Sequence, residues 1–126
     1  MPQAPTVLVA DDEEVVLNYV TLVLHEAGFE VLSATGGEQA LELVRKSQQP
    51  VTLAVLDVVM PHLNGPELFG QLREVYPGMR ALFMSGYNAP EAALPAGCEF
   101  LAKPFTATEL LRRVRETAAR PITHRA

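Results

Sequence analysis

Acidic, hydroxyl and amine side chains in this sequence stand directly after four short apolar runs. They are Asp11 with Asp12, Asp57, Ser85 and Lys103. If the runs are parallel strands of one sheet, their carboxyl ends share an edge, and these residues converge although they are far apart in the chain. The carboxylates would then repel one another, and a hard divalent cation such as Mg²⁺ relieves that repulsion.

Such a set of side chains suits phosphoryl transfer. A metal ion, the Lys103 ammonium and the Ser85 hydroxyl can together neutralise and bind phosphoryl oxygens. A carboxylate can also be the nucleophile and become an aspartyl-phosphate. Asp57 stands out because a carboxylate that ends a buried run is costly unless it is used. Each residue also has an ordinary explanation, such as helix capping for Asp12, and only their combination favours a functional site.

The segments between these residues alternate between strand and helix patterns. Short links between alternating elements predict right-handed crossovers and a parallel sheet. Strands are predicted at Thr6–Ala10, Phe29–Ala34, Val51–Leu56, Arg80–Met84 and Glu99–Ala102. Helices are predicted from Asp12 to Ala27, from a capping box at Thr35–Glu38 to about Ser47, from Asn64 to before Pro77, and from a second capping box at Thr106–Glu109 to about Ala119.

Two segments carry more detailed predictions. Between the last two strands, residues 86–98 contain two prolines and two glycines, which predict a shortened or irregular fourth helix, helical only at Pro90–Leu94. In the first helix, residues at helical spacing are predicted to face the core. They are Val16, Tyr19, Val20, Val23 and Leu24.

Length and composition indicate one globular domain across residues 1–126, with a core at about 6–119 and a polar tail at 120–126. The net charge of −5 argues against direct nucleic-acid binding. No apolar run is long enough to span a membrane, and the first residues do not look like a signal peptide. Cys98 is the only cysteine, which excludes an internal disulfide and fits a cytoplasmic location.

The chain resembles a response-regulator receiver domain of the chemotaxis-regulator type, from Thr6 to about Ala119. Each motif that carries the resemblance is weak alone, but the four in this order and spacing are specific. They are Val9–Glu13, Leu56–Pro61 with Asn64-Gly65, Met84–Tyr87 and Lys103–Phe105. The resemblance implies an α/β, flavodoxin-like, doubly wound five-stranded parallel sheet in the order 2-1-3-4-5. The amino-acid sequences of these motifs are most similar to those in receivers of hybrid sensor histidine kinases.

The resemblance also implies a role for each matching position. Asp57 would be the phosphoacceptor, and Lys103 would pair with the phosphoryl oxygens. Mg²⁺ would be bound directly by Asp12, through water by Asp11, and by the backbone carbonyl of Val59. Ser85 would be the switch hydroxyl, and Phe100 the aromatic that changes rotamer with it. The Lys103-Pro104 peptide would be cis. Val59 and Tyr87 flank the site, and an apolar Val59 predicts slow loss of the phosphoryl group.

The resulting function is a phosphoacceptor in a two-component phosphorelay. The phosphoryl group would come from a histidine kinase or a histidine phosphotransfer protein, with Mg²⁺, and would switch a protein-interaction surface. Such a domain acts on no outside substrate and is not an enzyme in the usual sense. One alternative is a non-phosphorylated interaction module, which usually lacks an acidic or lysine position that is kept here. Another is an aspartate-nucleophile phosphatase, which would need a second Asp where Val59 stands.

Overall fold

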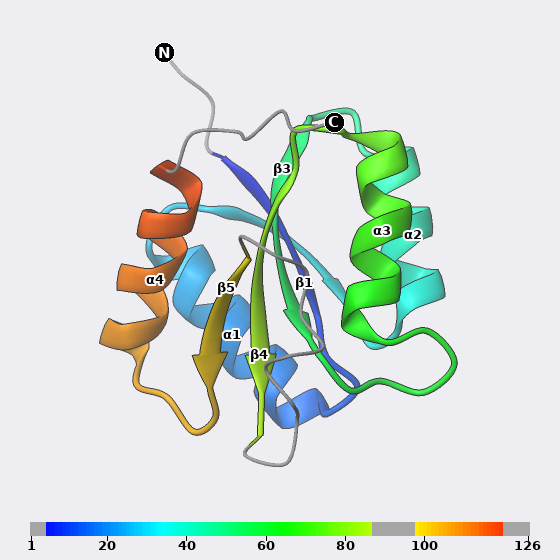
Figure 1. Cartoon of the computed structure of the whole chain (residues 1–126). Coiled ribbons are helices and arrows are strands. Elements are labelled where there is room, and N and C mark those ends of the chain that lie inside the picture. Colours follow the sequence, from blue (N-terminus) through cyan, green and yellow to red (C-terminus); the bar gives the residue numbers. More distant parts are fainter. Residues whose placement is uncertain (1–4, 87–97, 120–126) are drawn as a thin grey trace.

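Residues 5–86 and 98–119, which this computed structural model describes, form a parallel sheet with helices on both faces (Figure 1). The strands are β1 (Thr6–Ala10), β2 (Glu30–Ala34), β3 (Val51–Asp57), β4 (Arg80–Ser85) and β5 (Glu99–Ala102). The helices are α1 (Glu14–Glu26), α2 (Gly37–Lys46), α3 (Gly65–Val75) and α4 (Ala107–Ala119). The strand order is β2-β1-β3-β4-β5, as predicted.

The sheet separates two apolar cores. Helices α1 and α4 cover one face, and α2 and α3 cover the other (Figure 1). Successive side chains of a strand point to opposite faces, so Val55 belongs to the first core and Leu56 to the second. Because β3 is buried on both faces, its sequence is nearly continuous in apolar residues.

The strand register brings the polar residues at the strand ends to one edge. Ala10 at the end of β1 pairs with Leu56, and Asp57 pairs with Met84 on β4. Ser85 pairs with Ala102, so Lys103 follows directly beside it. All pairings are parallel, which confirms the predicted convergence of these ends.

Helix α1 differs from its prediction in two respects. It begins at Glu14 rather than Asp12, because the backbone N–H of Glu13 donates to Asp11 Oδ1 (2.8 Å) and Glu13 is held in an extended conformation. Its buried residues are Leu17, Val20 and Leu24. The inward assignment of Tyr19 was wrong, since its side chain is 41% exposed and its ring lies beside that of Phe105.

The two predicted capping boxes have different outcomes. Thr106 and Glu109 exchange the expected hydrogen bonds at the start of α4. The box at Thr35–Glu38 is wrong, because the N–H of Thr35 donates to Gln39 Oε1 and the N-cap position of α2 is a glycine without a side-chain bond. The sequence supplies an acceptor one residue later than the motif expects.

Some predictions fall outside the described residues. These are the irregular helix at Pro90–Leu94, the position of Tyr87 and the tail at 120–126. Among the residues that the structure describes, no helix has both the length and the apolar character needed to cross a membrane. The cis peptide between Lys103 and Pro104 is present.

Candidate functional site

Asp57 is the last residue of β3 and is almost fully buried. The backbone around it is held on two sides. The N–H of Val58 donates to the carbonyl of Met84 (2.9 Å), and the N–H of Gly65 donates to the carbonyl of Val58 (2.9 Å). These bonds fix the end of β3 against both β4 and the start of α3, and they hold the Asp57 carboxylate in place.

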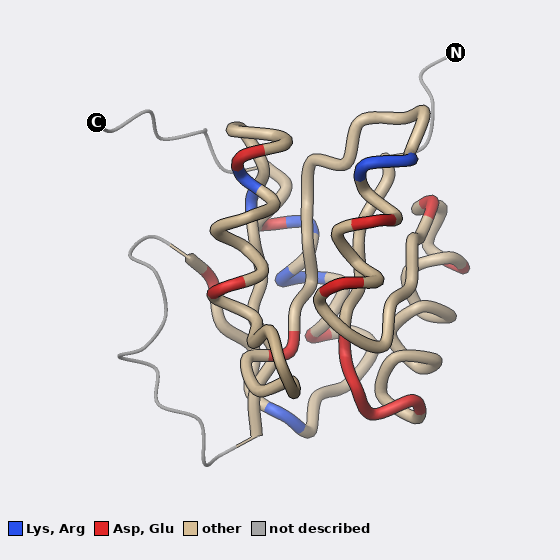
Figure 2. The backbone as a smooth tube through the Cα atoms, turned by 90° about the vertical axis from the view of Figure 1, so that its right-hand side faces the viewer, with Lys and Arg blue, Asp and Glu red and all other residues tan. Residues whose placement is uncertain are grey.

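Two further carboxylates come from the segment after β1. Asp11 is completely buried, and its N–H donates to the carbonyl of Ala34 (3.1 Å). Asp12 is exposed. Asp11, Asp12 and Asp57 each contribute one carboxylate oxygen to a group whose members lie within 4.8 Å of one another. The acidic run at residues 11–14 is the continuous red segment at the lower right of Figure 2.

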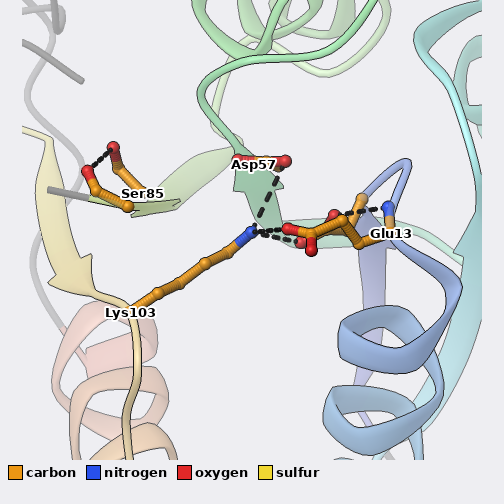
Figure 3. A network of polar contacts seen from close by, with 6 residues as sticks. Glu13, Asp57, Ser85 and Lys103 are labelled. Carbon is orange, nitrogen blue, oxygen red and sulfur yellow. Dashed lines mark hydrogen bonds and ion pairs between the residues drawn. The ribbon is translucent and has the colours of Figure 1, made fainter. Parts of the chain in front are cut away.

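The Lys103 side chain reaches this group from the end of β5 (Figure 3). Its backbone N–H donates to the carbonyl of Ser85 (2.8 Å), which fixes the base of the side chain. The ammonium Nζ lies 2.9 Å from Asp11 Oδ2, 3.2 Å from Glu13 Oε1 and 3.5 Å from Asp57 Oδ2. One cation is therefore shared among several carboxylates.

This sharing leaves the site with excess negative charge. Burial, followed by repulsion from Asp11, raises the pKa of Asp57 to about 7, although Lys103 opposes the shift. Burial lowers the pKa of Lys103, but the neighbouring carboxylates outweigh it, so that the net shift of its pKa is upward. Lys103 therefore carries its charge at neutral pH.

The donor set fits a hard divalent cation. Asp11 Oδ2 is buried, and its close neighbour is the Lys103 ammonium at 2.9 Å. Carboxylate oxygens at this spacing, with one of the residues exposed to solvent, match the preference of Mg²⁺ for a few carboxylates plus water. Asp11, Asp12 and Asp57 would hold such an ion.

The remaining predicted site residues lie around this centre. Ser85 is buried, and its hydroxyl donates to the carbonyl of Gly86 (2.8 Å), away from the carboxylates (Figure 3). Phe100 is partly buried on β5, opposite Phe83 in the register. Val59 is 65% exposed, and its backbone N–H bonds to the Asp57 carboxylate.

Glu13 is the contact residue that sequence reasoning missed. An acidic residue at the start of a helix is already explained by capping and the helix dipole, so nothing in the sequence pattern gave it another role. In the structure its carboxylate accepts a hydrogen bond from Lys103, 90 positions away. Only the fold reveals this contact.

The chain belongs to the family of response regulator receiver domains, whose sequence profile matches residues 7–115. It is similar to the sensor kinase CckA of Brucella abortus, with 37% identity over 88% of this chain and 12% of that protein. It is also similar to the response regulator receiver protein CpdR of the same species, with 29% identity over 86% of this chain and 92% of that protein.

Solved structures agree with this assignment. A putative response regulator from Chloroflexus aurantiacus has a TM-score of 0.81 and 31% identity, covering 94% of this chain and all of the other. The receiver domain of the hybrid histidine kinase CckA has a TM-score of 0.77 and 31% identity, covering 89% of this chain and 97% of that one.

The chain corresponds to a part of some relatives. It spans 12% of the sensor kinase CckA and 49% of the probable transcriptional regulatory protein TcrX of Mycobacterium tuberculosis, which is 34% identical over 90% of this chain.

Proposed function

We propose that this protein accepts a phosphoryl group on Asp57 from a phosphohistidine of a histidine kinase or a histidine phosphotransfer protein. The observation that carries the proposal is the convergence of Asp57 with Lys103, Asp11 and Asp12 at the carboxyl edge of the sheet. Membership in the receiver family supports it, as do the similarities to a sensor kinase and to a receiver protein.

In the proposed reaction, a carboxylate oxygen of Asp57 attacks the phosphorus. The new P–O bond forms as the P–N bond to the donor histidine breaks, and the electron pair of that bond stays on the imidazole nitrogen. Buried at the end of β3, the Asp57 carboxylate is fixed in direction by the surrounding backbone bonds. Lys103 supplies positive charge to the phosphoryl oxygens.

Mg²⁺ bound to the three aspartates would neutralise charge on the phosphoryl oxygens and on the carboxylates themselves. The chain's own contribution is to keep these carboxylates close together and to hold the Lys103 ammonium within 2.9 Å of Asp11 and 3.5 Å of Asp57. Without a cation, burial and then the neighbouring charge of Asp11 disfavour the ionised form of Asp57, and both raise its pKa.

The response to phosphorylation would begin at Ser85. Its hydroxyl now donates to the adjacent Gly86 carbonyl, so it can rotate toward a phosphoryl oxygen by exchanging one acceptor for another. Phe100, partly buried on the neighbouring strand, would change rotamer in step. These movements would switch a protein-interaction surface, which makes the chain a signalling domain without an outside substrate.

The test is phosphorylation by acetyl phosphate or phosphoramidate, with and without Mg²⁺, measured by intact-protein mass. A single adduct that needs Mg²⁺ and disappears in Asp57→Asn is expected. Glu74→Gln, an exposed carboxamide substitution far along α3, is the matched control and should be modified like the wild type. An adduct that remains in Asp57→Asn would refute the assignment.

The same experiment separates the alternatives. Absence of any adduct on folded protein would favour a non-phosphorylated interaction module. Multiple turnover of an added phosphate ester would favour an aspartate-nucleophile phosphatase. That second reading needs a general acid two residues after the nucleophile, and the exposed apolar side chain of Val59 cannot serve as one.

A further inference from the structure

Glu13 places its side chain in a direction that its position in the helix does not explain. It occupies the N-cap position of α1, where an acidic side chain ordinarily bonds to the free N–H groups of the first turn. Its side chain makes no such bond. Instead, Oε1 accepts a hydrogen bond from Lys103 Nζ at 3.2 Å (Figure 3).

Exposure distinguishes Glu13 from the other partners of Lys103. The Asp11 side chain is 0% exposed and that of Asp57 is 7% exposed, whereas that of Glu13 is 64% exposed. A buried carboxylate that loses its cation keeps an uncompensated charge, which is costly. An exposed one is simply rehydrated. Glu13 is therefore the partner that Lys103 can leave at the lowest cost.

The distances show where the ammonium lies before phosphorylation. It is closer to Asp11 and Glu13 than to Asp57, whose nearest oxygen is 3.5 Å away. A phosphoryl group on Asp57 would present new anionic oxygens, and charge-assisted bonds to them need the same ammonium.

We propose that Glu13 is a positioning residue, which holds the Lys103 ammonium toward the start of α1 in the unphosphorylated protein and competes for it with a phosphoryl group on Asp57. This inference rests on the proposed function of Asp57. It gives Glu13 a regulatory effect, because a tighter hold on Lys103 disfavours the phosphorylated state.

The first test measures binding of trifluoroberyllate, an anion that mimics a phosphoryl group on a carboxylate, at saturating Mg²⁺. Glu13→Gln should bind it about two- to fivefold more tightly than Glu14→Gln, the range that one partly exposed ion pair is worth. Glu14→Gln removes the same charge one residue further on, from an exposed position on α1. Glu13→Asp keeps the charge but shortens the reach, and it should resemble Glu13→Gln.

The second test needs neither metal nor phosphoryl chemistry. In metal-free protein, the ¹H–¹³C resonance of the Lys103 ε-methylene should shift in Glu13→Gln and Glu13→Asp and stay unchanged in Glu14→Gln. A structural role of Glu13 in capping alone would not move this signal. Urea unfolding of each variant checks that the exposed substitutions leave the fold intact.

The outcomes separate this inference from the proposed function. Equal trifluoroberyllate affinities for Glu13→Gln and Glu14→Gln would overturn it, and so would an unshifted Lys103 resonance. Failure of the wild type to bind trifluoroberyllate through Asp57 would instead refute the proposed function and, with it, the competition. Tighter binding of trifluoroberyllate by Glu13→Gln, together with a shifted Lys103 resonance, would support the inference about Glu13.

Discussion

The buried carboxylate of Asp57 lowers the stability of the folded protein at neutral pH. A buried carboxylate beside another buried carboxylate is unfavourable, and the raised pKa of about 7 is the measure of that cost. The folded protein therefore binds a proton more tightly than the unfolded chain does, whose Asp has a pKa near 3.8. Stability contributed by the protonated form is present at low pH and is lost as pH rises through the window from 3.8 to about 7.

Asp57→Asn should accordingly stabilise the metal-free protein above pH 7, by about 1–3 kcal/mol. The gain should shrink as the pH is lowered toward 4, because wild-type Asp57 is then neutral as well. Urea unfolding in EDTA across this pH range measures both. Glu74→Gln, an exposed substitution, should change little, and Mg²⁺ should stabilise the wild type more than Asp57→Asn. A less stable Asp57→Asn at pH 8 in EDTA would show that the buried charge is better compensated than its surroundings indicate.

Val59 supports a prediction about the lifetime of the phosphoryl group. It stands two residues after Asp57, the proposed phosphoacceptor, and its exposed apolar side chain cannot hydrogen-bond an attacking water. Val59→Asn should speed self-dephosphorylation about two- to tenfold, the value of one added hydrogen bond in the transition state. Loss of the adduct is followed by intact mass after removal of the donor. Val59→Leu, which stays apolar, should decay like the wild type, and an unaltered rate in Val59→Asn would contradict the argument.

At the scale of the elements, the two glycines of α3 have opposite roles. A Cβ on Gly65 would press against the backbone carbonyl of Asp57, and backbone there cannot move aside without shifting the site. A Cβ on Gly70 would meet nothing. The first glycine permits the close approach of α3 to β3, whereas the second only loosens the helix.

Gly65→Ala should therefore destabilise the protein by about 1–3 kcal/mol and slow phosphorylation of Asp57. Gly70→Ala should stabilise it by about 0.5–1 kcal/mol and leave phosphorylation unchanged. Urea unfolding and the rate of adduct formation with phosphoramidate test both. The same sign of stability change for the two variants would mean that helix propensity, rather than contact with β3, governs both positions.

The elements also show what the sequence can and cannot predict. Strand β3 is predictable because a short, nearly continuous apolar run between turn residues is typical of a buried parallel strand. The convergence of Asp57 and Lys103 then follows from the parallel arrangement of the strands. The inward assignment of Tyr19 fails because several phases of an apolar helical pattern fit equally well, and packing chooses between them. The contact between Glu13 and Lys103 lies beyond local patterns altogether, since it depends on how far two side chains reach across the fold.

At the scale of the whole molecule, the sheet lies between two apolar cores formed by the described residues. Leu56 on β3 lies in the core under α2 and α3, and Leu82 on β4 lies in the core under α1 and α4. Both side chains are fully buried. The two strands pair directly, so a loss of packing on one face is transmitted to the other through the shared backbone ladder.

Leu56→Ala and Leu82→Ala form a matched pair that tests whether the two faces of the sheet unfold as one cooperative unit. Each should lower the free energy of unfolding by about 2–5 kcal/mol, the cost of a buried Leu→Ala cavity. Each should also lower the hydrogen-exchange protection of slow amides in α1 and α3 alike, because in a two-state fold both helices become fully exposed only by global opening. If Leu56→Ala lowered protection in α3 alone, and Leu82→Ala in α1 alone, the two faces would be separate cooperative units. The site at the sheet edge would then rest on two layers that can loosen independently, and signals from Asp57 would travel to one face without the other.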